Sequence, residues 1–277
     1  MAVELRPGQN YVGQSAPSGG PVSRVGRVGF GGSGSVGRVW WGVGLGQSGA
    51  VDIVTLQRHC ARTWPGLEQS RLAEALDRVV AWYAERGLAP RLQLPARLPE
   101  ASGAEAGTEL LPEVAAWCDA RGWGSEPWTL VMLRAAGPSG VGVGVPGVEL
   151  RWSDRPDDDW LTLYHRAGAQ LPDAARRVIA AAPAQYLSVR VDGGLAGIGR
   201  VAPAGEVAVL TAIEVAARCR RRGFGTLITE TLAARGVRDG ARFSALQVFA
   251  DNTAAVALYR RLGFVADHRY RYRSPAS

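Results

Sequence analysis

The segment Arg218–Leu227, with the sequence RCRRRGFGTL, has the residue types and spacing in this chain that most directly indicate chemistry. Four of its first five residues are arginine, and Gly223 and Gly225 flank Phe224. Such a segment is either a basic patch that grips a nucleic acid backbone or a loop that holds phosphate. The elements on either side of it distinguish the two.

The arginine and glycine segment lies between an apolar strand, EVAVLTAIEVA (residues 206–216), and a helix expected over Gly223–Arg235. A helix N-terminus offers unpaired backbone N–H groups and the positive end of the helix dipole, and glycine lets an anion approach the backbone closely. Neighbouring arginines can neutralise the remaining charge. The segment lacks the GK[ST] of a nucleotide-hydrolysing loop. We therefore interpret it as a phosphate-binding loop.

Two motifs in this part of the chain resemble those of the GCN5-related N-acetyltransferases. The loop matches [RQ]xxGx[GA] after a hydrophobic strand, with Arg220, Gly223 and Gly225 at the defined positions. About thirty residues further on, ADNTAAVALYRRLGFVADHRY resembles the family's second motif. Its matching residues are Asn252, Ala255, Leu258, Tyr259, Gly263 and Phe264. The resemblance covers residues 148–277.

This resemblance implies an α/β (α+β) fold with a central mixed, mostly antiparallel sheet flanked by helices. It also implies acetyl-CoA as co-substrate, with the amides of Arg221 to Thr226 around the pyrophosphate and the pantetheine arm paired with the backbone around Ile213 to Val215. The residues expected to bind the acyl donor are Ile213, Val215, Arg220, Arg221, Arg222, Gly223, Phe224, Gly225, Thr226 and Asn252.

Tyr259 and Glu214 are the candidate catalytic residues. The resemblance places Tyr259 next to the sulfur, where it would protonate the departing thiolate, and Glu214 is the candidate general base for the amine. The alternative for Tyr259 is a core position, since it lies on the apolar stripe of its helix. Glu214 can act as the base only if its side chain lies on the face of the strand where the amine binds. Strand alternation alone does not show which face it occupies. Asn252 is expected to cap the helix that begins at Thr253, with or without a contact to the acyl donor.

No metal site is expected. Asp157, Asp158 and Asp159 precede a helix predicted to run to about Ala169, and carboxylates at a helix start typically serve the cap and the dipole. Cys60, Cys118 and Cys219 are widely spaced, with no CxxC and no Cys/His cluster. We expect reduced thiols in a cytoplasmic protein and no zinc.

The elements that must position these residues follow a clear order. Strands are expected at VELRWS, QYLSVRV and LAGIGRVA, the last two joined as a hairpin at Asp192–Gly194, with a short helix over Ala174–Ala181 before them. After the loop and its helix come the strand FSALQVFA, a helix over Thr253–Leu262 and a final strand containing HRYRYR. We assign residues 148–277 to the catalytic domain.

The remainder of the chain divides at about residue 50. Residues 1–50 are expected to be a glycine-rich, disordered leader, and its GxGxxG match at Gly29–Gly34 is a chance match because no helix can follow it. Residues 51–147 are expected to be a smaller, incomplete α/β domain with a linker, containing helices at Asp52–Cys60, Leu72–Arg86 and Leu110–Asp119 and the strands RLQLP and PWTLVMLR. This region resembles, less specifically, a degenerate first half of tandem actinobacterial acetyltransferases, distantly similar to mycothiol synthase.

The composition limits the partners. All 32 lysine-plus-arginine residues are arginine, and the formal net charge is +7. This charge permits an anionic ligand of any size, so a nucleic-acid-binding protein is a third possibility that rests on charge alone. No apolar run approaches the ~20 residues that a membrane helix needs.

The sequence therefore predicts an acetyl-CoA-dependent N-acetyltransferase that acts on a primary amine, either a small molecule or a protein, by direct attack in a ternary complex. No nucleic acid and no membrane are expected as partners, and the sequence does not indicate an oligomeric state. The alternative is an acyl-CoA-binding regulatory module with weak catalysis.

Overall fold

The computed structural model describes residues 69–99, 110–137, 147–164, 176, 179–180 and 182–276. The predicted leader (residues 1–50) with its GxGxxG match, the predicted helix Asp52–Cys60 and most of the predicted helix Ala174–Ala181 lie outside these residues. The described elements are α2 (Gln69–Ala84), β1 (Leu92–Ala96), α3 (Pro112–Ala120), β2 (Gly124–Ser125), β3 (Thr129–Ala135), β4 (Val148–Ser153), α4 (Asp158–Leu163), β5 (Gln185–Val191), β6 (Gly194–Ala204), β7 (Val207–Val215), η2 (Ala217–Cys219), α6 (Phe224–Arg238), β8 (Phe243–Phe249), α7 (Thr253–Arg261) and β9 (Val265–Ser274).

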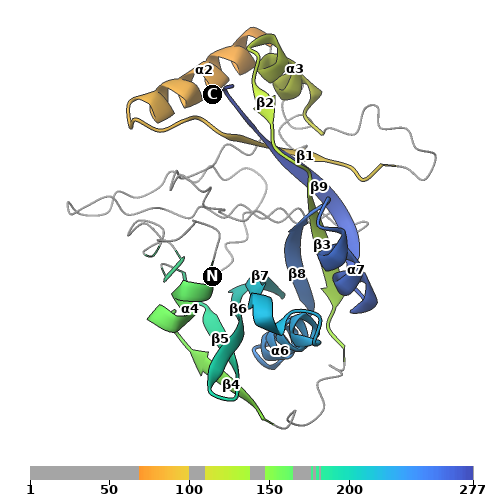
Figure 1. The fold of residues 1–277 in the computed structure, drawn as a ribbon. Coiled ribbons are helices and arrows are strands. Elements are labelled where there is room, and N and C mark those ends of the chain that lie inside the picture. The colour runs from red at the N-terminus through yellow and green to blue at the C-terminus, as the bar shows by residue number, and fades with distance from the viewer. Residues whose placement is uncertain are drawn as a thin grey trace.

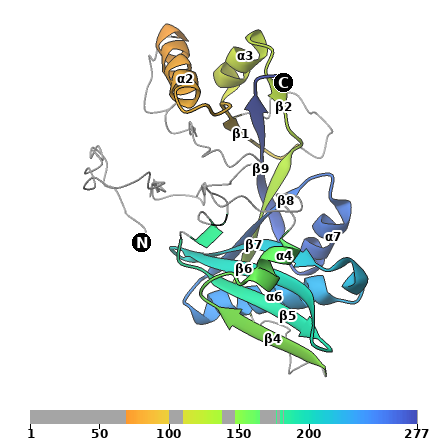
Figure 2. The same ribbon diagram turned by 60° about the vertical axis from the view of Figure 1, so that its left-hand side comes forward.

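The described strands form one nine-stranded sheet in the order β1-β9-β3-β8-β7-β6-β5-β4, with β2 also paired to β9. Among these strands β7 and β8 are the one parallel pair, and their crossover is α6. The predicted mixed, mostly antiparallel sheet flanked by helices is therefore confirmed. Figures 1 and 2 show α2 and α3 at one end of the molecule and β4 to β7 at the other, with β9 extending between them.

Local sequence explains most element boundaries. The β5–β6 hairpin turns at Asp192 and Gly193, both with positive φ, as the Asp-Gly-Gly stretch predicts. The Asp157 side chain accepts a hydrogen bond from the backbone N–H of Trp160 at 2.7 Å, which confirms the predicted cap of α4. The predicted extension of this helix to about Ala169 is wrong, because Tyr164 has ψ of 90° and ends α4 after Leu163.

Strand β3 is the connection between the two predicted regions. It precedes residue 147, yet it pairs antiparallel with β8 along its whole length and with β9 on its other side. The final strand β9 continues past β3 and pairs with β1 and β2. The two regions therefore share one sheet, and the domain division at residues 147 and 148 stays a prediction.

Three clusters of buried side chains stabilise this arrangement. The largest lies where α6 and α7 cover one face of the sheet. A second, which includes Trp160, Tyr186 and Ile198, lies on the opposite face beside α4. A third joins α2, α3 and β1 and includes Leu76, Trp117 and Leu94. The residues before 147 therefore have a small core of their own in addition to the shared sheet.

The Arg134 side chain, on β3, fastens the two helices of the largest cluster to each other. Its guanidinium forms an ion pair with Glu230 of α6 at 2.5 Å and donates a hydrogen bond to the carbonyl of Leu262, at the end of α7, at 2.8 Å. It also lies 4.9 Å from the Phe264 ring centroid. Because the Arg134 and Glu230 side chains are only 18% and 11% exposed, solvent screens this pair weakly.

Replacing Arg134 with Met tests this connection. The substitution keeps much of the apolar stem but leaves the Glu230 carboxylate buried without its partner, which costs about 3–5 kcal/mol. We expect the free energy of unfolding, measured by denaturant titration of the full chain, to fall by about that amount. The double variant Arg134→Met/Glu230→Met should regain a large part of it.

The matched control is Arg151→Met, at an exposed pair with Glu149, which should leave the free energy of unfolding close to that of the unmodified chain. Equal midpoints and slopes for Arg134→Met and the unmodified chain would show that the buried pair contributes nothing.

Candidate functional site

The central feature of the site is the separation of strands β7 and β8. Their parallel register runs from Val207 opposite Phe243 to Leu210 opposite Leu246 and stops there. Beyond Leu210, β7 remains paired with β6 through Val215, across one shift of register, but has no partner on β8. An open edge of this kind, inside a sheet, can accept an extended ligand as an additional strand.

A β-bulge in β7 lies where the strands separate. Ala212 has φ of 52°, an unusual value for a residue with a side chain, and the β6–β7 register shifts between Ile198 and Arg200. Two residues of β7, Ala212 and Ile213, therefore oppose the single residue Gly199 of β6. Bulges bend the bulged strand and re-aim its side chains, so this one accounts for the divergence of β7 from β8. No local pattern predicts this bulge, since alanine does not favour positive φ.

The predicted phosphate loop lies next to this separation. After β7, the short helix η2 leads to Arg221 with φ of 62° and Gly223 with φ of 85°, and α6 begins at Phe224. The first amide of this helix with a backbone acceptor among the described residues is that of Leu227, which donates to the carbonyl of Gly223 at 3.0 Å. No backbone acceptor is described for the amides from Arg221 to Thr226, and those from Gly223 to Thr226 are the unpaired N–H groups that the N-terminus of α6 provides.

Space around the loop fits a bound anion. An added Cβ at Gly223 would meet no atom within 4 Å, so this position faces open space, while one at Gly225 would lie 3.0 Å from a Leu258 methyl carbon. Gly223 thus serves the left-handed turn, and Gly225 permits α6 and α7 to approach each other. Phe224 is buried in the largest core cluster and fixes the loop to the sheet.

The loop arginines have different surroundings. Arg218 donates to the carbonyl of Leu195 at 2.8 Å, and Arg220 donates to the carbonyl of Val215 at 3.3 Å. The guanidinium of Arg222 lies 5.6 Å from the Phe224 ring centroid. Arg221 forms no hydrogen bond or ion pair within the part of the chain that the structure describes. Arg220, Arg221 and Arg222 are all exposed, so their guanidinium groups are accessible to an anion.

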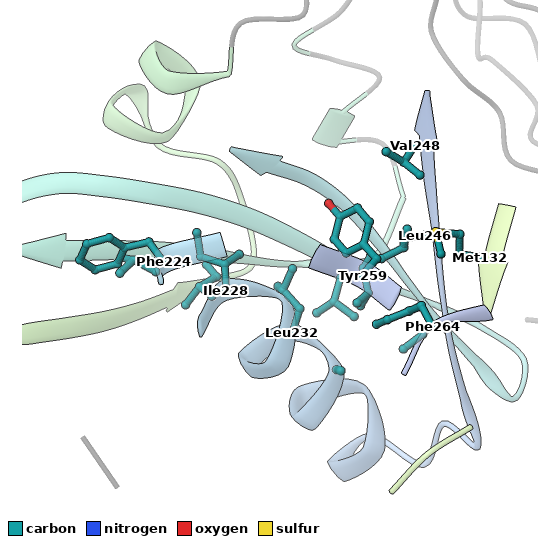
Figure 3. Close-up of a cluster of buried hydrophobic side chains, with 14 of the residues drawn as sticks. Met132, Phe224, Ile228, Leu232, Leu246, Val248, Tyr259 and Phe264 are labelled. Atoms are coloured by element: carbon teal, nitrogen blue, oxygen red, sulfur yellow. The ribbon is translucent and has the colours of Figure 1, made fainter. Parts of the chain in front are cut away.

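Helix α7 places Tyr259 in the core beneath the site. Its side chain is buried, and its ring lies 6.1 Å from that of Phe264 in an edge-to-face contact. Figure 3 shows the hydroxyl directed away from Phe264 and Met132. Asn252 caps this helix as predicted, since its side-chain oxygen accepts from the amide of Ala255 at 3.2 Å. The roles of Tyr259 and Asn252 toward a ligand stay predictions.

The structure settles which face of β7 carries Glu214. Ile213 and Val215 pack against the cluster beneath α6, and Glu214 lies between them on the strand, so it faces the other way. Its cross-strand partner is Ile198, which belongs to the cluster beside α4. Glu214 and Tyr259 therefore lie on opposite faces of the sheet, with the separation of β7 and β8 between them.

The described residues contain neither a candidate metal site nor a membrane-spanning helix. In this part of the chain, no group of three or more His, Cys, Asp or Glu side chains has the arrangement to hold a metal ion. None of the helices described is both long enough and apolar enough to cross a membrane.

Comparison with known proteins shows the family to which the chain belongs. The family model described as "Probable histone acetyltransferase Rv0428c C-terminal" matches residues 65–273. A search of curated proteins found no match.

Solved structures with a similar fold include three acetyltransferases. A GCN5-related N-acetyltransferase from Kribbella flavida is 17% identical, with a TM-score of 0.56 over 76% of this chain and 77% of that one. A tandem GNAT protein from the clavulanic acid biosynthesis pathway is 17% identical, with a TM-score of 0.58 over 79% and 73%. A GCN5-related N-acetyltransferase from Sphaerobacter thermophilus is 16% identical, with a TM-score of 0.56 over 76% and 69%.

These three structures share the fold of this chain, and the family match extends from α2 to the last strand. The chain therefore belongs to the Rv0428c C-terminal family of probable histone acetyltransferases and has the GCN5-related N-acetyltransferase (GNAT) fold.

Proposed function

We propose that this acyltransferase moves an acetyl group from acetyl-CoA to a primary amine by direct attack in a ternary complex. The observation that carries the proposal is the proximity in the chain of two features: the loss of β8 pairing after Leu210 and the unpaired amides of Arg221 to Thr226. The first suits an extended pantetheine arm, and the second suits a pyrophosphate.

The donor side of the site is the face covered by α6 and α7. The residues proposed to hold acetyl-CoA are Ile213, Val215, Arg220, Arg221, Arg222, Gly223, Phe224, Gly225, Thr226 and Asn252. Backbone groups of Ile213 and Val215 would hydrogen-bond the arm, and an amide of this bulged segment would polarise the thioester carbonyl. The loop amides and exposed arginines would neutralise the phosphates.

In the proposed reaction the amine nitrogen attacks the thioester carbonyl carbon, and the carbon–sulfur bond breaks. Glu214, directly or through water, accepts the proton that the amine loses. Tyr259 donates a proton to the departing thiolate sulfur. The two proton transfers take place on opposite faces of the sheet, in keeping with a donor and an acceptor that approach from different sides.

The alternative function is a regulatory module that binds acyl-CoA with little turnover. Calorimetric titration of the full chain with acetyl-CoA and with CoA tests whether either ligand binds, and thiol release with a panel of primary amines tests turnover. The proposal predicts binding of both ligands and amine-dependent thiol release. Binding without thiol release for any amine would favour the module, and the absence of binding would contradict both functions.

Substituting Tyr259 with Phe removes the proposed proton donor and leaves the aromatic ring in the core. Loss of a general acid typically lowers the rate by ~10²–10⁴-fold, so kcat should fall by that order while calorimetric CoA affinity is retained. Tyr272→Phe is the matched control, because this ring contacts Arg91, the residue before β1, at the far end of β9. An unchanged kcat in Tyr259→Phe would leave Tyr259 a core residue.

Substituting Glu214 with Gln removes the proposed base and keeps a similar shape. At neutral pH the amine then has no side chain to take its proton, so the rate should fall by ~10²-fold or more. Raising the pH deprotonates the amine in solution, and the rate of the variant should rise toward that of the unmodified enzyme. Parallel pH–rate profiles for the two proteins would exclude Glu214 as the base.

A further inference from the structure

Arg200, on β6, lies on the sheet face that also carries Glu214. Its neighbour Gly199 faces α6, since an added Cβ there would lie 2.7 Å from a Leu232 methyl carbon. The next side chain along the strand therefore faces away from α6. Arg200 is in register with Thr211, the first residue of β7 that has no partner on β8. The guanidinium thus originates where the two strands begin to separate.

Contacts from two neighbouring strands orient this guanidinium. Its Nε donates to the hydroxyl of Tyr186, on β5, at 3.3 Å, and Nη1 donates to the hydroxyl of Thr211, on β7, at 3.5 Å. The guanidinium also lies 5.7 Å from the Tyr186 ring centroid. The Tyr186 hydroxyl is itself fixed, because it donates to the carbonyl of Ile179 at 2.5 Å.

The partly buried Arg200 has no carboxylate partner among the residues that the structure describes. Three other arginines whose side chains are at most 18% exposed do have one: Arg134 pairs with Glu230, Arg190 with Asp159 and Arg273 with Asp119. Removing a guanidinium partly from water costs free energy, and an anionic partner offsets this cost. In Arg200 only Nε and Nη1 donate hydrogen bonds, and both donate to neutral hydroxyl groups. Nη2 has no partner in the described part of the chain.

Glu214 and Arg200 present opposite charges on the same face. Ile198 is opposite Glu214 in the register and lies two residues before Arg200 on β6. The two charged residues are therefore about 7 Å apart along the strand direction. This spacing, with two long side chains, suits a small molecule that carries an amine at one end and a carboxylate at the other.

We infer that the acceptor is an amine that also carries a carboxylate, such as a free amino acid, and that Arg200 binds this carboxylate. The inference rests on the proposed amine acetylation and adds the chemical class of its substrate. Arg200 would hold the carboxylate while the amine lies near Glu214 and the separation of β7 and β8. A lysine side chain in a basic protein segment would bring no such group to Arg200.

The first experiment compares three probes for each amino acid: the free amino acid, its carboxamide, and the amine left when the carboxyl group is removed. Each probe is titrated into the CoA-saturated full chain by calorimetry and is also offered with acetyl-CoA in a thiol-release assay. A charged hydrogen bond of the usual strength predicts about 10- to 100-fold tighter binding and a correspondingly lower KM for at least one free amino acid over its two uncharged analogues.

The second experiment repeats the comparison with Arg200→Gln. This variant should lose the preference for the free amino acid and bind all three probes with similar affinity, while CoA affinity is unchanged. Arg200→Lys keeps the charge but not the forked donor geometry, so it should regain part of the preference. Arg151→Gln, at an exposed position on the edge strand β4, is the control and should behave as the unmodified chain.

Two outcomes would overturn the inference. One is equal or better binding and turnover of the uncharged analogues by the unmodified chain, a comparison that needs no variant. The other is acetylation of a lysine-rich peptide, in preference to every free amino acid, at a rate that Arg200→Gln leaves unchanged. Binding of free amino acids that depends on Arg200 but is accompanied by no thiol release would support the carboxylate site and contradict the acetyl transfer.

Discussion

The end of β7–β8 pairing at Leu210 and Leu246 is the constraint on which the rest of the site depends. The Ala212 bulge turns β7 away from β8 while β6 stays paired with it, so an unpaired edge of β7 lies inside the sheet. The loop amides, the Tyr259 helix and the Glu214 face all acquire their relation to one another from this divergence.

Helices α6 and α7 cover the same face of the sheet, and residues from both halves of the chain fix their spacing. Gly197 and Gly199 let α6 lie directly on β6, because a Cβ at either position would meet Ile228 or Leu232 at less than 3 Å. Arg134 then joins α6 to the end of α7 through Glu230 and the Leu262 carbonyl. Precise placement of a proton donor and a phosphate loop requires such rigid support.

Local patterns in the sequence were sufficient for the loop, the Asp157 and Asn252 caps, the hairpin at Asp192 and most helices, because these features depend on residues close together in the chain. The insertion of β3 between β8 and β9 was not predictable in this way, since its partners lie more than 100 residues away in the chain. Neither was the bulge at Ala212, where tertiary packing overrides the residue's own backbone preference. The face of Glu214 and the surroundings of Arg200 required the bulged β6–β7 register, which no periodicity in either strand reveals.

The position of β3 also bears on how such a protein can change during evolution. A strand at the edge of a sheet can be lost or exchanged with little effect on its neighbours, whereas β3 forms hydrogen bonds on both sides within the C-terminal half. Recombination that replaced the first half of the gene with an unrelated one would leave β8 and β9 without a common partner. The two halves are therefore expected to be inherited together. Deletions in the first half are expected to be tolerated only where they lie before β3.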